Sequence, residues 1–306
     1  MPKLGSKSLI KSNVQYWMND RLLSYGLYSN VAVNESDFYG NDISYCNPVI
    51  GHPTYSDGSV FQSAFKNWVY ESGITLFESG VAAPIVASGV VVGGTFYDQA
   101  TTTGTFQHFI DYPNGTVIFN SPLGGTPIVQ AAFSYKAVTV KMANSLDNEN
   151  MELLIETALK DNPPQTGVVV YPQQNRQNTL PAIWIDFLAR KSLPYELGTK
   201  DPIKEFTGFF HVWTRGDMMQ DIIEDILADS QREVLIGIDF NSAPHPLLSR
   251  GRINPAWTTY ADMADIYGSY FWRKIYLDTA DQKQDKSLYE IERSRILFNI
   301  KAYPNF

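Results

Sequence analysis

Apolar side chains recur at helical spacing near the start of the chain. Between Ser8 and Tyr25 they stand three or four positions apart, which is the period that places them on one face of an α-helix. This segment is therefore predicted to be an amphipathic helix. The positions that carry the pattern are Ile10, Val14, Trp17, Arg21, Leu22 and Tyr25.

The next stretch, residues 26–80, has no clean period. Turn signals such as Tyr39-Gly40-Asn41-Asp42 and Ser56-Asp57-Gly58-Ser59 are frequent in it. We predict mostly irregular or extended chain here, with a short helix near Val60 to Tyr70. Residues 1–84 are thus expected to form an N-terminal helix and an extended segment.

Strand patterns dominate residues 85–143. Two apolar runs, Phe109–Tyr112 and Thr116–Phe119, are joined by Pro113-Asn114-Gly115. Proline presets φ and Asn-Gly tolerates positive φ, so the pattern predicts a hairpin. Apolar and polar residues then alternate from Val129 to Lys136, as in a half-buried strand. The range is predicted to be a small β-sandwich or barrel.

Residues 144–306 mix both periods. A helix is predicted behind Asp147, because Met151 to Leu159 repeat at helical spacing up to Asn162-Pro163-Pro164. Strands are predicted at 182–189, 206–214 and 234–240, with a helix over 217–230 that Asp217 and Gln220 begin as a capping box. Final strands are predicted at 270–277 and 287–302. The whole chain is predicted to be α+β.

A long excursion interrupts this C-terminal region at 241–268. It contains Pro244, Pro246, Gly251, Pro255 and Gly268, and loops of this length usually contact something. Its apolar and basic side chains are our candidate contacts with other subunits. They are His245, Leu247, Leu248, Arg250, Arg252 and Trp257.

Composition narrows the class of protein. The chain has 306 residues, 44% of them hydrophobic and 13% aromatic, which favours sheets and large contact surfaces. The formal charge is −8 and no dense run of Lys or Arg occurs, so sequence-specific nucleic-acid binding is not expected. A single cysteine, Cys46, rules out an internal disulfide framework. No signal peptide and no membrane span are visible, and no membrane partner is expected.

Catalytic patterns are not visible. The four histidines, His52, His108, His211 and His245, lie far apart and form no metal-binding motif, and no nucleotide-binding glycine loop occurs. His211 is interpreted as a strand residue. We expect no catalytic residue, cofactor or metal. The carboxylates Asp186 and Glu196 keep a glycan-active enzyme open as an alternative.

Two groups of residues resemble virion proteins of tailed phages. The run 90–97, continued by 110–119 and 133–135, is similar to β-modules of phage structural proteins. The run 180–185, followed by 194–198, 210–213 and a helix over 217–230, resembles α+β subunits of head-tail connectors and tail terminators. Together these runs cover about half of the chain.

This resemblance implies a role in the virion neck. Such proteins are made in the host cytoplasm and form rings of six or twelve copies between the portal and the tail. Neighbouring portal, neck or tail proteins would be partners, and DNA would pass through the channel without sequence-specific binding. An acidic lining suits that passage, because it repels the phosphate backbone. The 140 additional N-terminal residues depart from a minimal tail terminator.

A second functional class stays open beside the ring protein. The β-module is expected, in that alternative, to bind carbohydrate in a tail, baseplate or fibre-attachment protein. Exposed tryptophans such as Trp68 or Trp257 would then be protected by sugar.

Overall fold

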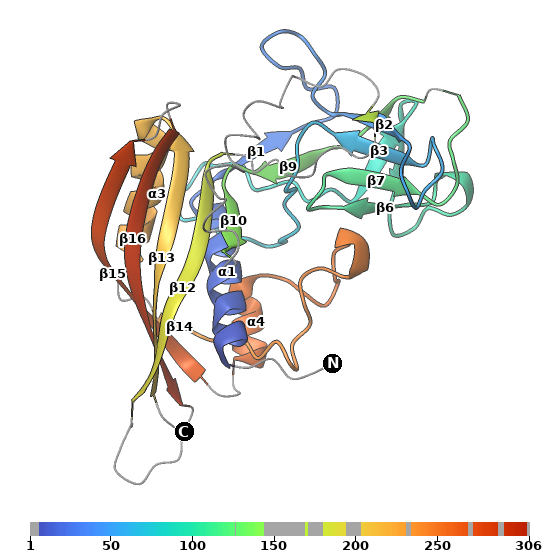
Figure 1. Cartoon of the computed structure of the whole chain (residues 1–306). Helices are drawn as coiled ribbons and strands as arrows, with labels where there is room; N and C mark the ends of the chain where they lie inside the picture. Colours follow the sequence, from blue (N-terminus) through green and yellow to red (C-terminus); the bar gives the residue numbers. More distant parts are fainter. Residues whose placement is uncertain are drawn as a thin grey trace.

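The structure of the protein, a computed structural model, describes residues 6–125, 127–143, 169–170, 180–193, 203–230, 234–268, 272–286 and 291–304. The fold is α+β and mostly sheet, with a curled half-barrel sheet and three α-helices among these residues, which confirms the predicted fold class. Figure 1 shows a tall sheet on one side of the first helix and a second group of strands on the other. The helix predicted behind Asp147 lies outside the described residues.

Two of the three described α-helices were predicted. Helix α1 spans Ser6–Ser24 and α3 spans Asp217–Asp229. The predicted capping box of α3 is wrong, because the N-cap residue is Gly216 and no side chain caps it. The Gln220 side chain turns inward instead, where it accepts a hydrogen bond from Thr214 and donates one to Glu224.

The tall sheet in Figure 1 has six strands in the order β10-β12-β13-β16-β15-β14. Strand β10 pairs with β12 in parallel, and all other pairs are antiparallel. The predicted strands are confirmed, except that the one expected at 234–240 ends at Leu235. The bounds are β10 Thr139–Met142, β12 Ala182–Leu193, β13 Ile203–Arg215, β14 Val234–Leu235, β15 Trp272–Lys286 and β16 Ile291–Pro304.

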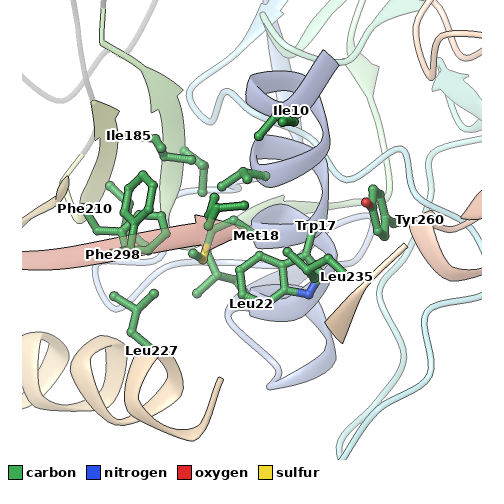
Figure 2. Packing of buried hydrophobic residues seen from close by; sticks show 14 of the residues in the cluster. Ile10, Trp17, Met18, Leu22, Ile185, Phe210, Leu227, Leu235, Tyr260 and Phe298 are labelled. Carbon is green, nitrogen blue, oxygen red and sulfur yellow. The ribbon is translucent and has the colours of Figure 1, made fainter. Parts of the chain in front are cut away.

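One face of this sheet carries the largest core. Alternate strand residues such as Ile185, Phe210 and Phe298 point toward α1, where Met18 and Leu22 meet them (Figure 2). Helices α3 and α4 contribute to the same cluster. The apolar face predicted for the first helix is therefore the surface on which this sheet packs.

The second region contains two sheets. Strand β1 pairs with β9, and a larger sheet runs β5-β4-β8-β2-β3-β7-β6, with β11 joined to β2. Strands β2 and β3 come from the stretch predicted to be mostly irregular or extended. The bounds are β1 Tyr28–Val31, β2 Tyr45–Ile50, β3 Val60–Ser63, β4 Gly89–Val92, β5 Thr95–Asp98, β6 His108–Asp111, β7 Thr116–Phe119, β8 Val129–Gln130, β9 Phe133–Lys136 and β11 Val169–Val170.

Two predictions within this region have different outcomes. The short helix expected near Val60 is wrong: the residues form β3, because Phe61 packs edge-on against Phe119 across the β3–β7 pair, with ring centres 5.6 Å apart. The predicted hairpin is confirmed as β6–β7. Its turn needs Gly115, which has a φ of 59° and whose Cβ would lie 2.1 Å from the Phe65 carbonyl oxygen.

The 241–268 excursion is more ordered than predicted. It contains a short 3-10 turn at Ser249–Gly251 and helix α4 over Tyr260–Tyr267. Thr259 caps α4 by accepting a hydrogen bond from the Asp262 N–H at 3.1 Å. Part of the expected loop is thus a helix that packs into the core beside α1.

Candidate assembly surfaces

Trp257 of the predicted contact set belongs to the core of its own chain. Its side chain is 5% exposed and packs against Tyr16 and Phe240. His245 is exposed but stacks on the same Phe240 ring, with centres 5.4 Å apart. Both side chains therefore make contacts within the chain.

The segment 247–253 docks onto the β6–β7 hairpin. The Gly251 carbonyl accepts a hydrogen bond from the Tyr112 N–H at 3.2 Å. A Cβ at Gly251 would lie 2.0 Å from the Asp111 carboxylate, so only glycine fits this approach. The excursion thus joins the two regions of one chain.

Arginines flank that glycine and reach the module. The Arg250 guanidinium lies 5.6 Å from the Tyr55 ring centre, and that of Arg252 lies 5.7 Å from Phe109, both within cation–π range. Leu247 forms a bridge with Ile253, while Leu248 keeps 43% of its surface exposed. Of the six predicted residues, Arg250 and Arg252 thus contact the second region, whereas His245 and Trp257 share the Phe240 ring.

The six-stranded sheet has two long edges. On the outer side of β15, β14 pairs only with Ile275 and Tyr276. From Leu277 to Lys286, no described strand lies on that edge. On the other side β10 covers β12 only up to Ile185, and the edge beyond it to Leu193 has no described strand either. Such edges offer backbone donors and acceptors to another strand.

The outer face of the same sheet carries a row of aromatic and basic residues. Trp184, His211 and Arg295 are direct neighbours across β12, β13 and β16. Two positions along, Arg293 lies over the Trp213 ring at 4.7 Å. We call these five residues the outer row. They face away from the core that α1 covers, because their strand neighbours Ile183, Ile185, Val212 and Ile296 belong to that core.

Four buried nitrogen atoms of the outer row have no hydrogen-bond partner among the described residues. Trp184 and Trp213 are 4% and 2% exposed, and within the described part of the chain neither indole N–H has a partner. The same holds for Nδ1 of His211 and Nε of Arg295. Burial, with Arg293 and Arg295 nearby, lowers the pKa of His211 to about 4. The row is therefore chemically complementary to an acceptor such as a carboxylate.

A buried charged group lies where the two regions meet. Lys136 of β9 pairs with Glu71 at 2.5 Å. Asp20 of α1 accepts a hydrogen bond from the Tyr260 N–H, and burial raises the pKa of this carboxyl to about 6. Each group has a partner inside the chain, so the cluster is a structural network.

The other candidate chemistry finds little support. Trp68 is fully buried and Trp257 nearly so, so neither predicted tryptophan is exposed to a sugar. Both rings have partners in the core: the Trp68 N–H donates to the Phe65 carbonyl, and the Trp257 ring stacks on Phe240. Asp186 lies in β12, whereas Glu196 lies outside the described residues. His211 is a strand residue, as interpreted.

The described residues show no cluster suited to a metal ion and no membrane-spanning helix. In the described ranges, no three His, Cys, Asp or Glu side chains gather in a way that would hold a metal ion. Nor is any helix of that part of the chain both long and apolar enough to cross a membrane. Cys46 is buried, which raises the pKa of its thiol to about 12.

Sequence reasoning missed the outer row and the open sheet edges. The row has a visible signal in the sequence, because residues two apart in a strand lie on the same face. This spacing separates His211 from Trp213, Arg293 from Arg295, and Trp184 from its neighbour on that face, Asp186. Which strands are neighbours was not visible.

No family model matches the chain, and no curated protein matches it.

Proposed function

We propose that this chain is a structural protein of a tailed-phage virion and forms a homo-oligomeric ring in the neck, around the channel through which DNA passes. It acts by assembly and not by catalysis. Its partners are copies of itself, six or twelve in number, and the neighbouring portal, neck or tail proteins.

The two open edges of the six-stranded sheet carry this proposal. From β12 through β13 and β16 to β15, each strand runs antiparallel to the last. Strands β12 and β15 therefore run in opposite directions, and β15 of one copy can add to β12 of the next as an antiparallel pair. Such a contact joins two different surfaces, and contacts of this type close into rings when the rotation permits.

The placement of the phage-like residues supports the same proposal. Residues 180–185 lead into β12, 210–213 lie in β13, and 217–230 form α3 and its end. The resemblance thus falls on one hairpin and the helix that follows it. Of these elements, β12 forms the edge that the ring would use, β13 is its neighbour, and α3 packs on β13 and β16.

Native mass spectrometry of the purified chain, with negative-stain imaging of the same sample, tests the proposal. We expect a closed ring of six or twelve copies. Adjacent N–H groups of a strand point to opposite edges. Of the two variants Asp278→Pro and Thr279→Pro, one therefore removes an N–H donor from the outer edge of β15. That variant should dissociate the ring while the monomer stays folded. A wild-type chain that stays monomeric in solution and is absent from virions would overturn the proposal.

A further inference from the structure

The loop between β1 and β2 projects from the top of the molecule in Figure 1. We call residues 32–44 the finger. Its tip presents Phe38 and Tyr39, which are 96% and 84% exposed. Their rings meet edge to face with centres 5.4 Å apart. Exposing two adjacent aromatic side chains to water is unfavourable, because their apolar surface is hydrated. Burial of both rings by a binding partner would remove this cost.

The tip is held in one shape by Asp37. Its Oδ1 accepts hydrogen bonds from the N–H groups of Tyr39 and Asn41, both at 2.8 Å. The Asn41 side chain donates to the same carboxylate, at 3.0 Å to Oδ2. These hydrogen bonds lower the pKa of Asp37, and the bond from the Asn41 side chain contributes most. The aromatic pair is therefore presented without support from a hydrophobic core.

The base of the finger is clamped as well. The Ile43 N–H donates to the Glu35 carbonyl at 2.8 Å. From β8, the Gln130 side chain donates to Asn34 and to Asp42, each at 2.8 Å. The finger is thus anchored to a buried strand residue. A preorganised loop loses little conformational entropy on binding, which favours affinity.

Charge decides which kind of partner fits. From Leu22 to Tyr135 the sequence has eight acidic side chains and a single basic one, Lys66. Three of the acids, Glu35, Asp37 and Asp42, lie in the finger itself. Phosphate backbones and anionic lipid surfaces would be repelled. Two copies would also repel one another where they present this same acidic surface.

We infer that the finger inserts Phe38 and Tyr39 into an apolar socket of a different protein, and that Lys or Arg side chains border this socket. Central aromatic anchors with complementary charge around them are typical of protein interfaces. This inference rests on the proposed function: the partner is a neighbouring protein of the virion, and the ring forms without it.

The test uses virions assembled with variant chains supplied in place of the wild type. The double variant Phe38→Ser/Tyr39→Ser should keep its melting temperature and its ring, because these side chains bury nothing in the chain. Its incorporation into virions should fall at least about tenfold, as expected when aromatic anchors are truncated. Asp37→Ala, which loosens the tip, should give a smaller loss.

A matched control is Phe96→Ser. Phe96 is also an exposed aromatic residue, at 55%, but it lies in β5, outside the finger. This variant should be incorporated normally. In particles whose chain is otherwise unchanged but carries p-benzoylphenylalanine in place of Tyr39, photo-crosslinking should join the finger to a different protein, near basic residues of that protein.

Each other outcome is decisive. Normal incorporation of the double variant would overturn the inference. Loss of the ring itself, or crosslinks only to a second copy, would make the finger a contact between identical subunits and also overturn it. If the wild-type chain forms no ring and is absent from virions, the proposed function fails first, which the wild-type sample alone reveals.

Discussion

The two regions of this chain treat their buried aromatic donors differently. In the β-module the Trp68 indole donates to the Phe65 carbonyl at 2.9 Å, and the Tyr112 hydroxyl donates to the Ala87 carbonyl at 2.5 Å. On the outer row of the six-stranded sheet, the indoles of Trp184 and Trp213 have no acceptor among the described residues. A donor buried without an acceptor costs free energy, so the core of the β-module satisfies its Trp68 and Tyr112 donors by itself, whereas the outer row does not satisfy its two indoles.

Charge divides the regions in the same way. The second region, residues 28–136, has eight acidic side chains and two lysines, Lys66 and Lys136, whereas the outer row contains Arg293 and Arg295 beside a neutral His211. An exposed acidic surface and a buried basic row give the chain two unlike faces. Such unlike faces suit contacts between different surfaces of successive subunits.

The largest expected effect comes from truncating the satisfied tryptophan. Trp68 stacks on Phe133 with ring centres 4.0 Å apart and is fully buried. Trp68→Ala should lower the free energy of unfolding by about 3–5 kcal/mol, because it opens a cavity in the module. Urea denaturation followed by circular dichroism measures this. A loss below about 1 kcal/mol would contradict the idea that the module is self-contained.

Acid should weaken the outer row in particular. The pKa of His211 falls from 6.5 to about 4 on folding, so between these values the unfolded chain binds more protons. The stability from neutral His211 is present above pH 6.5 and lost as the pH falls toward 4, by about 2–3 kcal/mol. The His211→Gln variant should lose less between pH 7 and 4.5.

The matched control for this pH series is His245→Gln. His245 is exposed on the 241–268 excursion, and its replacement should leave the acid-dependent loss as in the wild type. If the stability of the wild type and of His211→Gln fell equally with pH, His211 would not be the source of the acid-dependent loss.

Replacing indole by phenyl should separate the regions more finely. Trp68→Phe removes the hydrogen bond to the Phe65 carbonyl and leaves that carbonyl without this donor. The free energy of unfolding should fall by about 1–3 kcal/mol. Trp213→Phe removes a donor that has no acceptor among the described residues, so its effect should be about 1 kcal/mol smaller or even stabilising. Thermal and urea denaturation of the two variants, side by side, test this difference. Equal losses would mean that the Trp213 N–H is satisfied in solution.

The smallest expected effect concerns the segment that joins the regions. Arg252→Ala removes one guanidinium from the Phe109 ring and should cost about 0.5–1 kcal/mol, the range of an exposed cation–π contact. Arg252→Lys keeps the charge and should recover part of it. Hydrogen exchange at the Tyr112 amide, which donates to Gly251, reports whether the segment stays docked.

Local patterns were predicted well where they depend on neighbours in sequence. The first helix, the Asn114-Gly115 hairpin and the long C-terminal strands are confirmed, because period and turn chemistry act over a few residues. Strands β2 and β3 were missed because their partners are remote: Tyr45 pairs with Gln130, and Val60 with Ile118. No local period announces such pairs.

Prediction of the candidate surfaces was weaker for a related reason. Loop length drew attention to 241–268, but burial of Trp257 against Phe240 depends on tertiary packing that composition does not encode. Pro and Gly signals also hid α4, which begins at the Thr259 cap. The turn at Tyr39-Gly40-Asn41 was predicted, whereas the near-complete exposure of its aromatic residues appears only in three dimensions.

The short crossings between the regions have a mechanical consequence. The chain passes from α1 to β1 at Leu27 and from β9 to β10 at Ala137, and the Ala137 N–H donates to the Leu27 carbonyl at 3.0 Å. These two covalent links and the docked turn at Gly251 help to tie the regions together. A torque applied at the finger would therefore turn the six-stranded sheet as well, and the subunit would respond to load as a stiff lever with no single hinge.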